Sequence, residues 1–203
     1  MRYSFKTNYK RILADTTTPV SIYLRLRDTF PNSLLLDSSE YHSRDNNISY
    51  ICCQQIAGII LNDQELSISY PNQPKEIKQA SQINLREEVS AFRKSFEGLE
   101  LPEVNVISNG LFGYFTFDAV EHFEDIKLTA DADEARNIPF MQYHVYKYVI
   151  AIDHFRNQLY IFENLLDGEE SDLDRLEYLI QNKNFPEYSF EITVPFWVPN
   201  SKC

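Results

Sequence analysis

Two glycines and a run of aromatic residues mark Gly110-Leu-Phe-Gly-Tyr-Phe-Thr-Phe-Asp-Ala-Val-Glu-His-Phe-Glu124, the stretch that decides the expected fold. Nearly every residue from 111 to 117 is apolar, aromatic or glycine, which is typical of a strand buried on both faces. Gly113 has no side chain, so a neighbouring backbone can approach closely there. Asp118 is then expected to cap a short helix, with Glu121 completing a capping box. We expect a central strand that leads directly into a capped helical turn.

The composition bounds the class of protein. With 203 residues, 43% of them hydrophobic, the chain can bury a core as one large domain or two small ones. It has only 5 glycines, which argues against a glycine-rich phosphate-binding loop. The formal net charge of -11 would repel polyanions, so nucleic acid and anionic membranes are not expected as partners.

The cysteines and histidines indicate a reduced protein without a metal site. Cys52 and Cys53 would face opposite sides of a strand, and with Cys203 the total is odd, so no disulfide framework is expected. The histidines at positions 42, 122, 144 and 154 lack the spacing of zinc ligands. The first residues have no signal-peptide core, and no apolar run approaches the roughly 20 residues of a membrane span. We expect a cytoplasmic protein.

The first third of the chain contains signals for two strands and a helix. Residues 3–7 alternate as in a short strand. Thr18 followed by Pro19 is a strong helix start, and the helix is expected to end near residue 29. Residues 33–37 are too few for a helix and indicate a buried strand.

The middle of the chain indicates a hairpin and a helix. Residues 48–61 predict one bent strand or two strands, with the bend at Gly58. Residues 65–70 would complete the hairpin, and residues 71–78 form a polar loop. An amphipathic helix ending at Gly98 should follow, with four residues on its apolar face: Leu85, Val89, Phe92 and Phe96.

The last third predicts a second hairpin, from residues 140–152 and 158–164. Ser171 should cap a final helix. Residues 125–137 are expected to form an exposed loop, and residues 185–195 could add an edge strand. The apolar face of that helix would carry Leu173, Leu176, Leu179 and Ile180. Strands outnumber helices and are joined mostly by hairpins, so the expected class is α+β. We expect mostly antiparallel, sandwich-like β-sheets flanked by a few helices.

Few side chains form a pattern that could carry chemistry. The chain has no nucleophile elbow, dinucleotide fingerprint, phosphate-binding loop or zinc-protease motif, and no catalytic residue is assigned. Asp37, Ser38 and Ser39 follow the predicted strand at 33–37. A carboxylate there could pair with an amine, with hydroxyls completing the hydrogen bonds. The commoner alternative is a turn in which these side chains satisfy local backbone groups.

Several collinear segments together resemble component I of anthranilate synthase. Thr18-Pro-Val-Ser-Ile-Tyr and Ser33-Leu-Leu-Leu-Asp-Ser-Ser-Glu40 are similar to its Thr-Pro-Val-x-x-Tyr helix and Leu-Leu-Glu-Ser strand end. Ser49-Tyr-Ile fits its Tyr-Ser-Phe-Ile strand. Residues 110–124 resemble its Gly-Gly-Leu-Val-Gly-Tyr-x-x-Tyr-Asp-x-Val-Arg-x-Phe-Glu signature, and Tyr148-Val-Ile-Ala-Ile-Asp-His154 resembles its next strand. These matches span nearly the whole chain.

The resemblance implies a role within a larger protein. Component I converts chorismate and ammonia to anthranilate and pyruvate in tryptophan biosynthesis, using Mg²⁺ and a glutamine amidotransferase partner. Its chorismate and metal site lies in a C-terminal domain, of which this chain shows no motif. Residues 1–203 are therefore expected to be a single regulatory N-terminal domain, without a cofactor or activity of its own. The family's tryptophan feedback site maps onto Leu36, Asp37, Ser38 and Ser39.

Two residues depart from the family pattern. Asp37 replaces a glutamate and is one methylene shorter, which bears on the strength of any feedback site, and Glu121 replaces an arginine. Two alternatives stay open. One is the N-terminal domain of the sister enzyme that makes aminodeoxychorismate for folate, and the other is a stand-alone α+β binding module.

Overall fold

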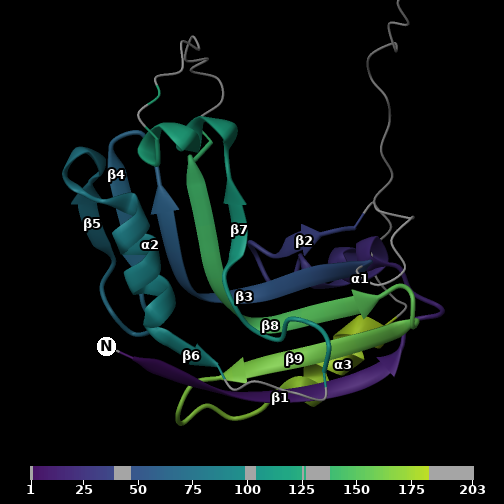
Figure 1. Cartoon of the computed structure of the whole chain (residues 1–203). Helices are drawn as coiled ribbons and strands as arrows, with labels where there is room; N and C mark the ends of the chain where they lie inside the picture. Colours follow the sequence, from purple (N-terminus) through teal and green to yellow (C-terminus); the bar gives the residue numbers. More distant parts are fainter. Residues whose placement is uncertain (1, 39–46, 99–103, 125, 127–137, 183–203) are drawn as a thin grey trace, which may run out of the picture.

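The fold is organised around one long antiparallel pair, β3 (Ile48–Leu61) and β8 (Met141–Asp153). The two strands run side by side from Ile48 opposite Asp153 to Leu61 opposite Met141. In this computed structural model the described residues are 2–38, 47–98, 104–124, 126 and 138–182 (Figure 1).

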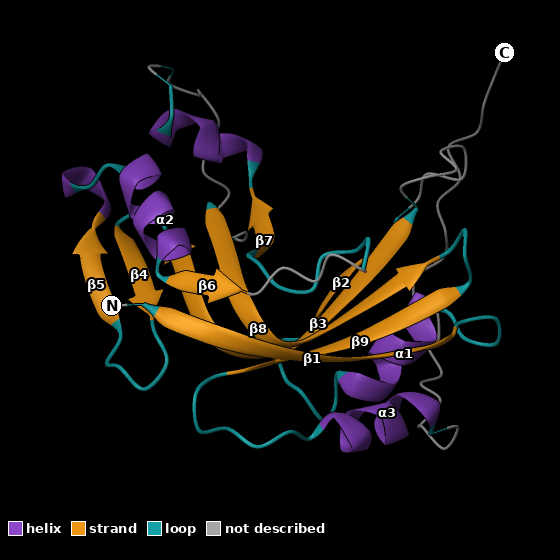
Figure 2. Cartoon of the chain, turned by 60° about the horizontal axis from the view of Figure 1, so that its bottom comes forward, coloured by secondary structure: helices purple, strands orange, loops and turns teal. Residues whose placement is uncertain are grey.

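Seven further strands complete the sheet: β1 (Tyr3–Leu13), β2 (Leu34–Leu36), β4 (Glu65–Ser69), β5 (Glu76–Gln79), β6 (Phe96–Gly98), β7 (Phe112–Phe115) and β9 (Gln158–Leu165). Their order is β5-β4-β3-β8-β9-β1-β6, with β2 beside β3 and β7 beside β8. All described pairs are antiparallel except β1 with β6. The predicted α+β class is confirmed, with the strands in one continuous, bent sheet (Figure 2).

The helices are α1 (Pro19–Leu26), α2 (Leu85–Lys94) and α3 (Leu173–Gln181), with 3₁₀ turns η1 (Ala80–Gln82) and η2 (Phe117–His122). α1 and α3 lie together against one face of the sheet, whereas α2 lies beside β4 and β6 (Figure 2). No described helix is long and apolar enough to cross a membrane.

A β-bulge in β3 changes the face of the sheet on which its apolar side chains pack. One half of the strand contacts α1 and α3, and the other half contacts α2. The register with β8 shifts between Gln55 and Ala57, so β3 has an extra residue there. Before the bulge, Ile51 packs in the cluster with α1 and α3; after it, Ile59 packs in the cluster with α2. In a regular strand these two residues would share a face, so the extra residue reverses the side-chain direction. The expected bend at Gly58 is wrong, because the irregularity precedes it.

The core lies on both faces of the sheet. On one face, Ile150 packs with Ile22 of α1 and Leu176 of α3. On the other, Met141 and Val145 pack with α2, and Val149 with the aromatic residues of β9. Cys53 belongs to the first face and Cys52 to the second, as the sequence predicts, and both thiols are free.

The start of α1 follows its capping signal. Thr18 Oγ1 accepts a hydrogen bond from the Ser21 N–H, and Ser21 Oγ accepts one from the Thr18 N–H, each at 3.1 Å. Together with Pro19 in the first turn, this confirms the predicted start. The helix ends at Leu26 rather than near residue 29. The opening strand extends to Leu13, well beyond the expected residue 7, because β9 pairs with it from Lys6 onward.

Two predictions in the middle of the chain are wrong. Phe96 was expected on the helix that carries Phe92, but α2 ends at Lys94 and Phe96 begins β6, which pairs with β1. The polar loop expected over residues 71–78 contains the start of β5, which pairs with β4. β5 and β6 are both short, and they form because they pair with β4 and β1, not because their sequences alternate.

The stretch quoted first is also placed differently from its prediction. β7 covers only Phe112–Phe115, and its one described strand neighbour is β8. It is therefore an edge strand and not a central one. Asp118 does not cap a helix, because Thr116 is the N-cap of η2 and no side-chain cap bond forms. The expected close approach at Gly113 is confirmed: a Cβ there would lie 2.8 Å from Tyr143 Cα and closer still to the Gln142 carbonyl oxygen.

The start of the last helix is held by a carboxylate of the sheet, and its own N-cap residue, Asp172, forms no side-chain cap bond. Ser171 Oγ, the predicted cap, instead donates to Glu163 Oε2 at 2.5 Å, and Glu163 Oε1 accepts the Asp172 N–H at 2.7 Å. A buried carboxylate of β9 thereby satisfies the start of α3. The second hairpin is confirmed as β8 and β9. The exposed loop predicted over 125–137 and the edge strand over 185–195 fall almost wholly or wholly outside the described residues.

Candidate functional site

The predicted ligand-binding residues lie where β2 ends. β2 pairs with residues 50–52 of β3, and Leu36 at its last position is 38% exposed. The expectation of a buried strand is wrong here, because β3 is its only described strand neighbour. As a consequence, the Asp37 carboxylate that follows is exposed and can be reached by a ligand.

A buried serine anchors this strand end. Ser49 of β3 is 0% exposed, and its hydroxyl donates to Asp37 Oδ1 at 2.6 Å. The Ser49 oxygen accepts the Ser38 N–H at 3.2 Å and lies 2.7 Å from His154 Nε2. Because the one hydroxyl proton goes to Asp37, His154 must carry its own proton on Nε2. One hydroxyl therefore ties together the ends of β2, β3 and β8.

This cluster is not a nucleophilic triad. In a serine hydrolase the carboxylate orients the histidine and the histidine takes the serine proton. Here Asp37 takes the serine proton itself, and Ser49 has no exposed surface for an incoming electrophile. The arrangement fixes the position of the exposed Asp37 carboxylate.

An unsatisfied acceptor lies at the same end of the sheet. The Asn47 carbonyl accepts the His154 N–H at 3.1 Å, which places Asn47 beside the cluster. Its side-chain Oδ1 is buried without a hydrogen-bond partner. Buried acceptors normally have a partner, and this atom, which has no exposed surface, is an exception beside the cluster.

The structure brings together Leu36, Asp37 and Ser38, whereas Ser39 lies outside the described residues. The sequence did not single out Ser49 and His154 as site residues. They reach Asp37 only because β2 and β8 flank the start of β3, and a sequence pattern does not contain that pairing.

Two further kinds of reactive group, metal-ligand clusters and ionised thiols, can be checked among the described residues. They include no group of three or more His, Cys, Asp or Glu side chains arranged to hold a metal. Burial raises the pKa of Cys53 to about 11 and raises the pKa of Cys52 as well, so both thiols stay protonated near neutral pH.

Comparison with known proteins supports one family. Anthranilate synthase component 1 of Lactococcus lactis subsp. lactis is 27% identical over 174 residues, which cover 85% of this chain and 36% of that protein. The protein of the same name from Acinetobacter calcoaceticus is 27% identical over 183 residues, with the same two coverages. The chain is related to anthranilate synthase component I.

The relationship covers only part of these proteins. The Thermus thermophilus component 1 is 25% identical over 165 residues, which cover 80% of this chain and 33% of that protein. The chain thus spans about a third of the length of the curated relatives it matches. Anthranilate synthase component I from Streptococcus pneumoniae aligns with a TM-score of 0.42 and 20% identity over 85% of this chain and 35% of that one. No family model matches the chain.

Proposed function

We propose that this chain is the N-terminal region of an anthranilate synthase component I and that the end of β2 supplies one wall of a tryptophan feedback site. The proposal rests on one observation: an exposed carboxylate, Asp37, is fixed in place by a fully buried hydroxyl, Ser49. The similarity to component I over 85% of this chain supports the proposal that an amino acid is the ligand beside this carboxylate.

The chemistry of the strand end suits an amino-acid ligand. The Asp37 carboxylate would pair with the ligand ammonium, a charge-assisted contact that contributes about 1.5–3 kcal/mol. Because Ser49 already holds the carboxylate, little side-chain entropy is lost when the ligand binds. The exposed part of Leu36 would contact the apolar side chain of the ligand.

Catalysis would belong to the part of the relatives that this chain does not cover. In this proposal that part binds chorismate and Mg²⁺, and a glutamine amidotransferase supplies ammonia. We therefore expect the purified 203-residue chain, given chorismate, ammonia and Mg²⁺, to produce no anthranilate fluorescence above a blank. Fluorescence above the blank that grows with protein concentration would contradict this.

The deciding experiment measures tryptophan binding and inhibition. We expect the 203-residue chain to bind tryptophan weakly or not at all in calorimetry, because half of the pocket is open to water. A longer polypeptide, which also contains the part that corresponds to the other two-thirds of the relatives, should bind tryptophan well. In that polypeptide, Asp37→Asn should raise the inhibition constant by about tenfold or more, as expected for a lost charge-assisted contact. Uninhibited turnover should change little.

A matched control separates binding from folding. Asp63→Asn removes a carboxylate from the exposed β3–β4 turn and should leave both inhibition and melting temperature unchanged. If Asp37 only closes a turn, Asp37→Asn lowers the melting temperature and leaves inhibition alone. That result would end the feedback-site assignment. If inhibition shifts as expected while the melting temperature holds, Asp37 belongs to the tryptophan site, and an effect of tryptophan there on a separate chorismate site would be allosteric coupling.

A further inference from the structure

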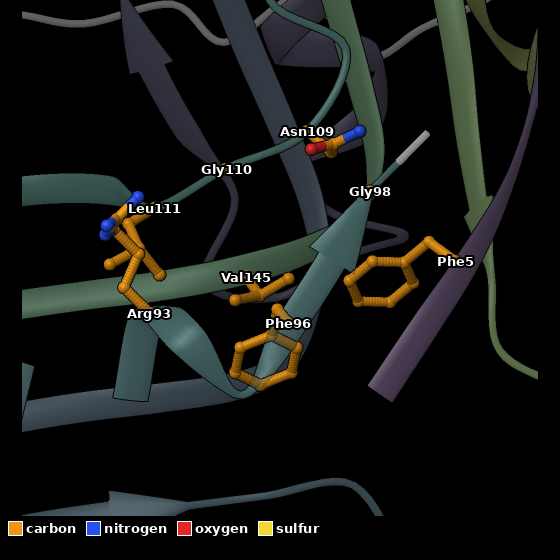
Figure 3. Close-up of a pocket in the computed structure, with 8 residues that line it drawn as sticks. All are labelled: Phe5, Arg93, Phe96, Gly98, Asn109, Gly110, Leu111 and Val145. Carbon is orange, nitrogen blue, oxygen red and sulfur yellow. The ribbon is translucent and has the colours of Figure 1, made fainter. Parts of the chain in front are cut away.

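A separate pocket of about 420 Å³ opens between β1, β6, β8, the end of α2 and the loop before β7 (Figure 3). Its size lies within the range of small-molecule sites. It shares no residue with the Asp37 cluster. The lining residues are Phe5, Arg93, Phe96, Gly98, Asn109, Gly110, Leu111 and Val145.

The floor of the pocket is apolar and aromatic. The rings of Phe5 and Phe96 are stacked, with centroids 5.9 Å apart and planes within 5° of parallel. Val145 of β8 and Leu111 complete this surface (Figure 3). Aromatic walls of this kind favour a flat apolar ligand.

The wall formed by residues 107–111 is held in place before any ligand arrives. Asn164, which is fully buried, donates from Nδ2 to the Ser108 carbonyl at 3.1 Å, and the Ile107 N–H donates to the Tyr50 hydroxyl at 3.1 Å. Gly110 has φ of 151°, a conformation that residues with a Cβ rarely adopt. A wall anchored in this way costs little ordering entropy on binding.

The only charge in the lining is positive. Arg93 lies beside Leu111, while the Asn109 amide lies near Gly98 (Figure 3). Among the described residues no carboxylate pairs with the Arg93 guanidinium. Glu97, the acidic residue nearest to Arg93 in the sequence, forms an ion pair with Arg2, with 2.8 Å between Glu97 Oε1 and Arg2 Nη1. A guanidinium at the edge of an apolar pocket, with no carboxylate partner among the described residues and in a chain of net charge -11, favours an anionic ligand.

We propose that this pocket binds a small aromatic monocarboxylate, with its ring against Phe5 and Phe96 and its carboxylate on Arg93. The Asn109 amide supplies a further hydrogen bond to a polar substituent or to the carboxylate. This site is independent of the proposed tryptophan site, since the two share no side chain.

The test uses benzoate as the probe and backbone amide spectra of the ¹⁵N-labelled 203-residue chain as the readout. We expect saturable shifts at Phe96, Gly98 and Gly110. Arg93→Gln should weaken benzoate binding by about fivefold or more, because a charged hydrogen bond is lost. Arg86→Gln, which removes an exposed arginine from the first turn of the same helix, should leave binding unchanged.

Two matched probes test the two parts of the ligand. Acetate, which lacks the ring, and benzamide, which lacks the charge, should each bind more weakly than benzoate. The proposal is overturned if benzoate causes no saturable shift at these amides, if Arg93→Gln binds it as tightly as Arg86→Gln, or if benzamide binds as tightly as benzoate. Because Arg93 is exposed on the surface of α2, both variants should fold.

Discussion

β7 and β8 are neighbouring strands of similar apolar character, yet they are buried to very different extents. β8 has ten consecutive buried residues, from His144 to Asp153. In β7 only Phe112 is buried, while Phe115 is 42% exposed and Phe117 just beyond is 80% exposed. β8 has β3 on one side and both β9 and β7 on the other, whereas β7 has only β8 among the described strands. Burial here follows the number of neighbouring elements, because both strands are rich in apolar side chains.

The sharpest test of this difference removes one large side chain from each region. Ile150 of β8 is 0% exposed and packs against α1 and α3, so Ile150→Ala should lower the free energy of unfolding by about 2–5 kcal/mol. Phe117→Ala should change it by less than about 0.5 kcal/mol, because the ring is already in water. Urea denaturation of both variants measures this. Equal losses would mean that Phe117 is covered by another part of the molecule.

The second test forces β7 away from β8. A side chain on Gly113 would collide with the backbone of Gln142 and Tyr143, so Gly113→Val should cost roughly 1–3 kcal/mol. An edge strand can relieve the clash by separating, which limits the loss. Hydrogen exchange should therefore accelerate at the β7–β8 pairs and stay slow at the β8–β9 pairs. Uniform acceleration across β8 would show that β7 is not a separable edge.

The smallest expected effect is a pH dependence at the junction of these strands. His144 lies opposite Phe112, and burial lowers its pKa below the ordinary 6.5, against an opposing hydrogen bond to the Ala57 backbone. The unfolded chain therefore binds the proton at higher pH than the folded chain. The stability present above pH 6.5 should be lost as the pH falls from 6.5 towards the folded pKa.

Two histidine variants isolate this contribution. His144→Gln should weaken the pH dependence of the denaturation midpoint between about pH 7 and pH 5, because the group that titrates there is removed. His122 lies on η2 and not on β7 or β8. His122→Gln should therefore keep the wild-type change of denaturation midpoint with pH. If His144→Gln keeps the wild-type slope instead, His144 does not contribute to it.

The elements that the sequence predicted well share a local cause. α1 begins where Thr18 and Pro19 signal it, because an N-cap and a first-turn proline act within one turn. The second hairpin forms where two apolar strands meet a short turn, and Asn157 there adopts a positive φ of 51°. The resemblance to component I also came from local motifs, and the comparisons confirm it.

The candidate site was predicted in part. Asp37 and Ser38 could be named from their motif, but Ser49 and His154 could not, since they join Asp37 only through the pairing of β2, β3 and β8. The Arg93 pocket was also hidden, because its lining comes from four separate parts of the chain.

The sequence by itself determined where α1 starts, where the second hairpin turns and that Cys52 and Cys53 face opposite sides, because these depend on neighbouring residues. Only the tertiary structure decided that β8 is central and β7 an edge. It also decided that a bulge reverses β3 and that Glu163 of β9 caps α3. An apolar residue gains stability from any cover that excludes water, and the hydrophobic effect has no direction. Which strand is paired along both of its edges is therefore decided by the packing of the whole chain.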